Sequence, residues 1–325
     1  MLALNTAIGL ALIFLWLQFV DVGQIFLTLS QTNLSYLILV FIFLFFSIFI
    51  RSLRFKIFLS KIKRIKFSDL LFLNGVAMLF NFYIPIRAGE IAKGIYLNTQ
   101  YGLPLSKSLV WVFLDRFLDF LVVLLLSGVL LLIIPTSLSI NFITIIIIIL
   151  SLALLVTYLA IFNKDFAQKL VKFLINLLIF KNIKIYFERF SSFILDSFTI
   201  LNRKPIDLFS LLFLTILAYA TDAAIWYFTF LAISYPQPFI NMYLGQLLSA
   251  LTYLIPAAPG YVGSAEASGF LIFSGVFGLE PNLASAMVVL FHILTAVFIL
   301  IFGIISVYFL KIDLRMILKK ALHRS

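Results

Sequence analysis

The residues of this sequence that are best suited to chemistry are ionisable side chains within or beside long apolar stretches. They are Arg87, Glu90, Lys93, Asp115, Arg116, Asp119, Glu266 and His292. On membrane-insertion scales a charged residue at the centre of a spanning helix costs about 2.5–3.5 kcal/mol, so such residues default to functional candidates. These positions are therefore the first candidates for a functional site.

Each candidate also has a structural interpretation. Glu90 and Lys93 are three residues apart and could neutralise one another across one helical turn. Arg116 and Asp119 have the same spacing. Asp115 and Asp119 share a helix face where like charges repel, so that one is protonated or each has a separate cation. A proton-linked step and a structural network both fit this pair.

Two ionisable residues are more isolated. Asp222 lies in the middle of the apolar segment "YATDAAIW", and we interpret it as a hydrogen-bonding bridge between helices rather than as a ligand. His292 stands alone on an apolar helix, where a histidine commonly belongs to the packed core.

Sequence motifs of enzymes are scarce. The chain has no cysteine, which excludes disulfides, thiolate metal sites and a cysteine nucleophile. It has no HExxH zinc pair and no P-loop, and "GYVGS" is not a nucleophile elbow. We therefore expect no metal, no cofactor and no enzymatic activity. A membrane enzyme built on Glu90, Asp115 and Glu266 stays open as an alternative.

The composition predicts that an integral membrane domain positions these residues. Of the 325 residues, 64% are hydrophobic and 11% are charged, and several uncharged runs reach the roughly 20 residues that a spanning helix needs. No stretch is left for a water-soluble domain, so we expect one membrane domain over residues 1–325. The first apolar run lacks a basic leader and a small-residue cleavage site, and we interpret it as a retained helix.

The distribution of basic residues predicts the topology. The 24 Lys and Arg fall within residues 51–66, 87–116, 164–204 and 311–324. Under the positive-inside rule the first, third and fourth clusters face the cytoplasm, together with both termini. The expected crossings are residues 2–20, 34–50, 108–133, 141–162, 206–233 and 284–310. The expected outward segments lie near residues 21–33, 135–141 and 234–241.

Two apolar segments do not fit as crossings and are predicted to form re-entrant hairpins. Residues 70–84 would enter from the cytoplasm, turn within "PIRAG" and return as a helix over residues 90–103. Residues 243–255 and 265–277 would form a second hairpin that enters from outside. Backbone that is not helical at such depth is tolerated only where protein shields it or where it lines a wet cavity. The fold class is thus all-α, with about six crossings and two hairpins.

A connection between two halves of the chain, about residues 34–133 and 206–310, is also predicted. It consists of the crossing 141–162 and an amphipathic linker over residues 163–204. Apolar residues recur in this linker at helical spacing opposite lysines, which is typical of a helix lying on the cytoplasmic membrane surface.

The two hairpins carry a short internal repeat. "IPIRAGE" and "IPAAPGYVGSAE" each begin with Ile-Pro, pass through glycine and end in glutamate. Arg116 follows Glu90 by 26 residues, and His292 follows Glu266 by 26 residues. Each half thus reads as crossing, hairpin, glutamate and crossing with a basic group. The halves have opposite orientations in the predicted topology, as in many transporters.

The turn of each hairpin is a candidate anion site. A helix that begins inside the membrane presents unpaired N–H groups and the positive end of its dipole. Arg87 and Lys93 add positive charge beside the first turn. A phosphate-bearing head group is therefore the expected ligand.

The motifs also resemble those of a known family. "IPIRAGEIAKGIYL" and "DRFLD", followed by "IPAAPGYVGSAE", are similar to the flippase-like membrane domain of lysylphosphatidylglycerol synthases and its stand-alone relatives. The resemblance covers nearly the whole chain. It implies a polytopic domain that moves, or helps to move, a lipid between leaflets. Synthase activity is not expected, because the aminoacyl-transfer domain is missing.

The resemblance can be followed residue by residue. The residues that match its two motifs are Arg87, Gly89, Glu90, Pro259, Gly260, Gly263 and Glu266. Lys93 stands where the family commonly has arginine, and Asp115 stands where it commonly has glutamate; both keep the sign of the charge. His292 stands where an arginine often occurs, and because it titrates near neutral pH it puts a fixed positive charge there in doubt.

Together these observations predict a lipid translocase of the plasma membrane whose hairpins meet near the middle of the bilayer. The expected partners are membrane lipids with an anionic phospholipid or polyprenyl-phosphate-linked head group. The net charge of +11 is explained by anionic lipids near the spans, and no nucleic acid is expected. An enzyme acting on lipid phosphate and a non-catalytic scaffold are the alternatives. A protein partner and a homo-oligomer are left open.

Overall fold

The computed structural model describes residues 2–60, 62–84, 88–163, 205–252 and 258–312, with four further residues between 164 and 204. Over these residues the chain consists of helices and turns without a β-strand. The all-α fold class is therefore confirmed. Most of the predicted linker 163–204, the turn residues Pro85–Arg87 and the basic C-terminus beyond residue 312 lie outside the described residues.

The chain begins with α1 (Leu2–Leu17) and α2 (Val22–Ser30), which meet at a bend of 86°. Asp21 caps α2 by accepting from the backbone N–H groups of Gly23 and Gln24. Its own backbone N–H donates to the Asn282 side chain at 2.7 Å. The segment interpreted from the sequence only as outward-facing thus contains a helix that packs on α13 (Pro281–Phe309).

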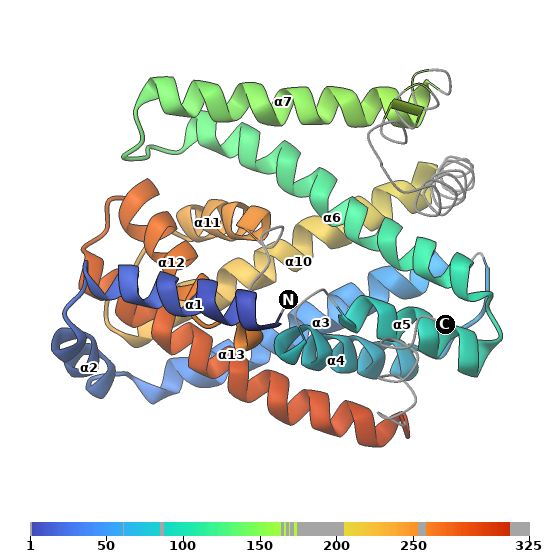
Figure 1. Cartoon of the computed structure of the whole chain (residues 1–325), viewed down its shortest axis with the longest axis horizontal. Helices are drawn as coiled ribbons and strands as arrows, with labels where there is room; N and C mark the ends of the chain where they lie inside the picture. The colour runs from blue at the N-terminus through green and yellow to red at the C-terminus, as the bar shows by residue number, and fades with distance from the viewer. Residues whose placement is uncertain are drawn as a thin grey trace.

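The first hairpin consists of α4 (Phe67–Tyr83) and α5 (Ala88–Tyr101), which pack along one another. In the second, α11 (Phe239–Thr252) forms one arm. The other arm is a short 3-10 turn (Pro259–Tyr261), α12 (Ser264–Phe270) and a π-helix (Leu271–Val276). Figure 1 shows the two hairpins on opposite sides of the molecule, with α11 and α12 on one side and α4 and α5 on the other.

The long helices are α3 (Leu34–Leu59), α6 (Leu105–Ile133), α7 (Ile140–Phe162), α10 (Pro205–Ala232) and α13. They pair in a crossed pattern: α3 packs along α10, α4 of the first hairpin packs on α13, and α11 of the second packs on α6. Each hairpin is thus held by the last long helix of the other half. An inverted repeat would produce this arrangement, and the repeat itself stays a prediction.

Close contact between α4 and α13 depends on small residues. A Cβ atom on Gly75 would lie 2.1 Å from the Ser306 hydroxyl, and one on Gly303 would lie 2.8 Å from the Leu79 side chain. Small residues at helix crossings let the backbones approach closely, which is how helices commonly pack in membranes. Two apolar clusters complete the core, one joining α3 to α4, α5 and α6, and the other joining α3 to α10, α11 and α13.

The loops gather at two ends of the molecule. The Asn33 backbone N–H donates to the Ala232 carbonyl at 2.8 Å, and the Ser137 N–H donates to the Val276 carbonyl at 2.8 Å. In each contact one residue lies in a segment that was predicted to face outward, and the other lies at the end of a predicted crossing or hairpin arm. The α3–α4 and α5–α6 connections lie at the opposite end (Figure 1). The assignment of that end to the cytoplasm stays a prediction.

Four of the described helices are long and apolar enough to cross a membrane: α3, α6, residues 209–232 of α10, and α13. The bent pair α1–α2 is a fifth if it counts as one span. α7 has 23 residues, of which Ile140–Val156 counts as a shorter apolar helix. The protein is therefore polytopic, and the count of six crossings stays a prediction.

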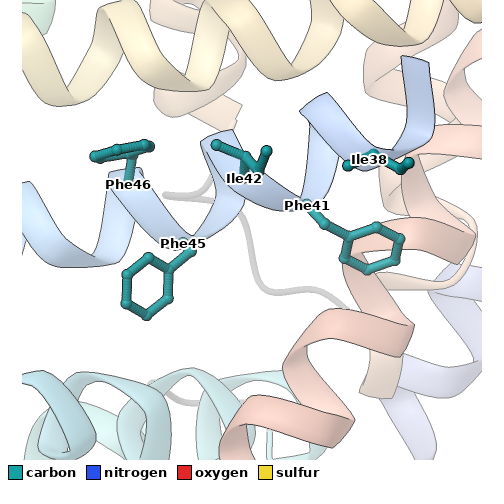
Figure 2. A pocket seen from close by; sticks show the side chains of 5 residues that line it. All are labelled: Ile38, Phe41, Ile42, Phe45 and Phe46. Atoms are coloured by element: carbon teal, nitrogen blue, oxygen red, sulfur yellow. The ribbon is translucent and has the colours of Figure 1, made fainter. Parts of the chain in front are cut away.

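The outer face of α3 illustrates the apolar surface. Figure 2 shows the side chains that line a hollow of about 540 Å³ there, namely Ile38, Phe41, Ile42, Phe45 and Phe46. Ile38 is 65% exposed. An apolar surface of this kind suits contact with lipid chains. The hollow contains none of the ionisable candidates.

Candidate functional site

The first charged cluster consists of Glu90 and Lys93 on α5 and Arg116 on α6. Glu90 Oε2 lies 3.3 Å from Lys93 Nζ, and Glu90 Oε1 lies 3.2 Å from Arg116 Nε. The Lys93 side chain is 2% exposed, whereas that of Arg116 is 29% exposed. Glu90 thus engages two cations at once, one buried and one open to the surroundings. The sequence hypothesis that Glu90 pairs with Lys93 is realised.

Close contact between the two arms of the first hairpin positions Glu90. The Gly89 backbone N–H donates to the Asn81 side chain at 2.8 Å. A Cβ atom on Gly89 would lie 2.0 Å from the Ala77 carbonyl oxygen, so a larger residue would separate α5 from α4. At the other end of the hairpin the Tyr101 hydroxyl donates to Asp69 at 2.5 Å. Burial, together with this hydrogen bond, raises the pKa of Tyr101 to about 12 and keeps the hydroxyl a donor.

Asp115 and Asp119 share a partner that sequence reasoning missed. Arg54 of α3 donates from Nε to Asp115 Oδ1 at 3.0 Å, and its Nη1 donates to Asp119 and, at 2.8 Å, to the Thr215 hydroxyl. The Arg54 side chain is fully buried. Asp119 also pairs with Arg116 at 3.2 Å, as its spacing predicted. The structure therefore differs from the hypothesis of separate cations, since one arginine bridges both carboxylates.

The role of the first basic cluster is corrected in part. We predicted a crossing that ends at residue 50, followed by basic residues that only orient the chain. α3 instead continues to Leu59, which keeps Arg51 and Arg54 within the helix bundle. Arg51 Nη2 lies 2.6 Å from Asp222 Oδ2, and the Ser47 hydroxyl donates to Asp222 at 2.6 Å. Asp222 thus links α10 to α3, as interpreted from the sequence.

A sequence signal for these arginines did exist. Arg51 and Arg54 are three residues apart and continue an apolar helix without a break. Asp115, Asp119 and Asp222 lie inside apolar segments elsewhere in the chain. A buried carboxylate is strongly destabilising without a cation. Matching these carboxylates to cations in other segments would have pointed to Arg51 and Arg54.

The charges of this network balance among the described residues. Its cations are Arg51, Arg54, Lys93 and Arg116, and its carboxylates are Glu90, Asp115, Asp119 and Asp222. Arg87, which was expected to add positive charge, lies outside the described residues. An anionic ligand at these cations would therefore exchange places with a carboxylate rather than meet an unpaired cation.

The second charged cluster consists of Glu266 on α12 and His292 on α13. His292 Nδ1 lies 2.5 Å from Glu266 Oε1, and His292 Nε2 lies 2.6 Å from the Gly260 carbonyl oxygen. Glu266 Oε2 accepts the Gly263 backbone N–H at 2.7 Å. In both halves, the basic residue 26 positions after the glutamate therefore contacts that glutamate.

The backbone of the second turn requires its glycines. Gly260 has φ of 71° and Gly263 has φ of 80°, a region that residues with a side chain rarely adopt. A Cβ atom on Gly263 would also lie 2.0 Å from the Gly9 carbonyl oxygen of α1. Pro259 begins the 3-10 turn. The matched residues of the second motif thus shape the break that positions Glu266.

The end of α4 contacts the turn of the second hairpin. Phe82, at the end of α4, lies with its ring centroid 6.0 Å from that of Tyr261 and 6.5 Å from that of His292, both edge-on. The first hairpin therefore touches the second charged cluster directly.

Comparison with known proteins identifies the family of the chain. Over residues 2–303 the chain matches the family described as the lysylphosphatidylglycerol synthase TM region. The match includes all the candidate residues. No curated protein and no solved structure shows a significant match. The chain is therefore an integral membrane protein of the lysylphosphatidylglycerol synthase transmembrane-region family, with a function related to membrane lipids.

Proposed function

We propose that this protein is a lipid translocase of the cell membrane that moves a lipid with an anionic, phosphate-bearing head group between leaflets. The substrate class is an anionic phospholipid or a polyprenyl-phosphate-linked lipid. One observation carries the proposal: Glu90 engages both Lys93 and Arg116 at the start of the returning helix α5. Its carboxylate pairs with the two cationic side chains to which a phosphate would bind.

Exchange at Glu90 gives the site two states. In the empty state Glu90 pairs with both Lys93 and Arg116, and Asp119 supplies a second carboxylate to Arg116. In the loaded state a head-group phosphate replaces the carboxylate, with Arg116 as the accessible contact because it is 29% exposed. The ion-pair distances of 3.2 and 3.3 Å exceed the roughly 2.7–2.9 Å of tight charge-assisted hydrogen bonds. Exchange at Lys93 and Arg116 therefore replaces two contacts that are longer than tight charge-assisted hydrogen bonds.

The hairpins supply the surroundings of this exchange. The N-terminus of α5 lies near the middle of the molecule (Figure 1), where the positive end of its dipole favours a phosphate. The lipid chains would stay along apolar outer surfaces. In the proposed orientation both termini face the cytoplasm, since the basic residues that follow α3 and α13 then lie inside.

Reconstitution into vesicles tests the proposal. A fluorescent anionic phospholipid is bleached from outside by an impermeant reductant, and the protected fraction measures translocation. We expect Arg116→Gln to slow translocation roughly tenfold or more, because a hydrogen bond to a charged group contributes about 1.5–3 kcal/mol. Lys107→Gln is the matched control, since Lys107 is exposed on the same helix and should leave the rate unchanged.

Further measurements distinguish a translocase from an enzyme and from a scaffold. Glu90→Gln removes the competing carboxylate, so more anionic lipid should co-purify with that variant than with the wild type, as measured by mass spectrometry. Equal translocation by wild type and the Glu90→Ala, Glu266→Ala double variant would contradict the proposal. A change in lipid mass during incubation would favour an enzyme. Tolerance of charge-neutral substitutions at Arg87 and Glu90 would favour a scaffold.

A further inference from the structure

The second charged cluster is built differently from the first and has a different chemical capacity. We propose that Glu266 and His292 form a binding site for a single proton at the break of the second hairpin, and that binding and release of this proton is coupled to lipid movement. The proton site stands on its own geometry, whereas the coupling rests on the proposed function.

The contacts of His292 fix the position of one ring proton. Its Nε2 lies 2.6 Å from the Gly260 carbonyl oxygen. A carbonyl oxygen only accepts hydrogen bonds, so Nε2 carries a hydrogen. The question of a further proton therefore concerns Nδ1.

The distance between Nδ1 and Glu266 requires another proton. Nδ1 lies 2.5 Å from Glu266 Oε1, and an unprotonated nitrogen facing an ionised carboxylate at this distance would set two lone pairs against each other. One proton must lie between them. The pair is then either imidazolium with carboxylate or neutral imidazole with carboxylic acid, and both forms bind one proton beyond that on Nε2.

This proton is linked to the backbone of the hairpin. Glu266 Oε2 accepts the Gly263 N–H at 2.7 Å, and His292 holds the Gly260 carbonyl. Both residues of the pair therefore hold the turn between α11 and α12, while His292 anchors it to α13. Loss of the proton would turn the attraction between Nδ1 and Oε1 into repulsion and weaken this anchorage.

Charged groups on the neighbouring elements are engaged elsewhere. α1 and α2 contain no Asp, Glu, Lys, Arg or His in their described residues, and Asp21 caps the start of α2. On α4, Asp69 is hydrogen-bonded to Tyr101. Glu280 caps α13 at its far end.

The remaining neighbours of α12 and α13 behave in the same way. On α10, Asp222 is paired with Arg51 of α3, and Arg54 of α3 is paired with carboxylates of α6. Tyr243 of α11 donates to the Ile216 carbonyl. On the turn itself, the Tyr261 ring packs edge-on against Phe82. Among the described groups, each member of the pair is thus the charge partner of the other.

The pair is accessible to a proton. The side chains of His292 and Glu266 are 15% and 11% exposed. A cavity of about 240 Å³ adjoins the same break and is lined by Thr6, Gly9, Leu10, Ala258, Pro259 and Val262. The site is therefore neither sealed in the core nor open on the surface.

Histidine NMR on the full-length protein tests the proton site without lipid transport. The chain has two histidines, His292 and His323, so a His323→Gln background with isotope-labelled histidine reports His292 alone. In the wild-type pair we expect both ring nitrogens to change together in one step as the pH is raised and the shared proton leaves. Glu266→Gln is the matched variant: its amide can accept from the Gly263 N–H and donate to Nδ1, which keeps the contacts without a group that titrates.

The variants give opposite expectations. In Glu266→Gln, Nδ1 should remain a hydrogen-bonded acceptor and the one-step transition should be absent. In Glu266→Ala no carboxylate faces Nδ1, so the pH at which His292 titrates should differ from that in the wild type. The proton site is overturned if His292 titrates identically in the wild type and in Glu266→Ala.

Vesicles with a pH gradient test the coupling. The translocation rate of the wild type should change at least about twofold when the gradient is imposed, which corresponds to a shift of roughly RT ln 2 in the activation free energy. The rate of Glu266→Gln should be the same with and without the gradient. Translocation that is gradient-independent in the wild type overturns the coupling while the NMR result stands. Absence of any lipid movement by the wild type overturns the proposed function and the coupling together.

Discussion

Arg54 shows how much of this molecule depends on single buried charges. Its guanidinium is fully buried and bridges α3 to Asp115 and Asp119 on α6 and to Thr215 on α10. Burying a guanidinium is costly unless carboxylates surround it, and the carboxylates in turn depend on it. The same residue is therefore a fold determinant and the neighbour that holds Asp119 beside Arg116.

Removing Arg54 should destabilise the protein strongly. Arg54→Leu removes the buried cation that bridges Asp115 and Asp119 and leaves them only the partly exposed Arg116. We expect a loss of about 3–5 kcal/mol in the free energy of unfolding. Thermal or denaturant unfolding in detergent measures this loss.

A matched variant distinguishes charge from packing at this position. Adding Asp115→Asn and Asp119→Asn to Arg54→Leu removes the carboxylate charges that Arg54 balanced, so much of the lost stability should return. An unfolding transition of Arg54→Leu that coincides with that of the wild type would show that the bridge contributes little.

Sequence reasoning at the residue scale found the acids of the network more readily than their partners. Glu90 with Lys93, and Arg116 with Asp119, are neighbours on one helix, and their spacing is enough to predict the contact. Arg54 reaches Asp115 across two different helices. That contact depends on the depth and rotation of both helices, which local spacing does not specify.

At the scale of elements, helix breaks position the two glutamates. In the first hairpin, the close approach of α4 and α5 at Gly89 and Ala77 fixes where α5 begins. In the second, Gly260 and Gly263 adopt positive φ. The arms of both hairpins were predicted within a few residues of the observed helices because apolar length and the Ile-Pro and glycine signals are local features.

The Gly89 contact can be tested by substitution. Gly89→Ala puts a methyl group where 2.0 Å separates the new Cβ from the Ala77 carbonyl, and we expect a loss of about 1–3 kcal/mol from overpacking. Gly275→Ala is the control, since nothing lies within 4 Å of its new Cβ. Unfolding transitions of the two variants provide the comparison, and equal stability of both would contradict close packing at Gly89.

Other features of the elements escaped prediction. Residues 265–277 were expected to be one helical arm, but α12 ends at Phe270 and a π-helix follows. The Ser137 hydroxyl donates to the carbonyl oxygens of Gly275 and Val276 in this π-helix. The partner lies more than a hundred residues away in the chain, so no local pattern could have indicated it.

At the scale of the whole molecule, the halves interlock. α4 packs on α13 and α11 packs on α6, so each hairpin contacts a long helix of the opposite half. Arg116 and His292 lie on those long helices. The charged clusters are thus located where the two halves pack on each other. This location suits a transporter whose halves change their relative position.

Contact between the end of α4 and the turn of the second hairpin can be checked by cross-linking. The natural chain has no cysteine, so Phe82→Cys with Tyr261→Cys gives a unique pair. Because the two rings lie with centroids 6.0 Å apart, we expect rapid disulfide formation or bridging by a short bis-maleimide in membranes. Mobility on non-reducing gels measures it.

The control pairs Phe82→Cys with Tyr308→Cys. Tyr308 lies near the end of α13 and is 86% exposed, so this pair should remain uncoupled within one molecule. Cross-linking of the control as fast as the Phe82 and Tyr261 pair would contradict the contact between the end of α4 and the second turn.

The sequence by itself determined the helical class, the approximate bounds of the long helices, both hairpins and the glutamates that begin their returning arms. It also showed a basic residue 26 positions after each of these glutamates. These features follow from hydrophobic length, backbone preferences and spacing along one chain. The tertiary structure decided that Arg51 and Arg54 neutralise the buried acids, that the network is balanced, and that His292 lies against Glu266. The reason is that the state of a buried charge is set by whichever groups packing brings within a few ångströms, and those groups come from helices far apart in sequence.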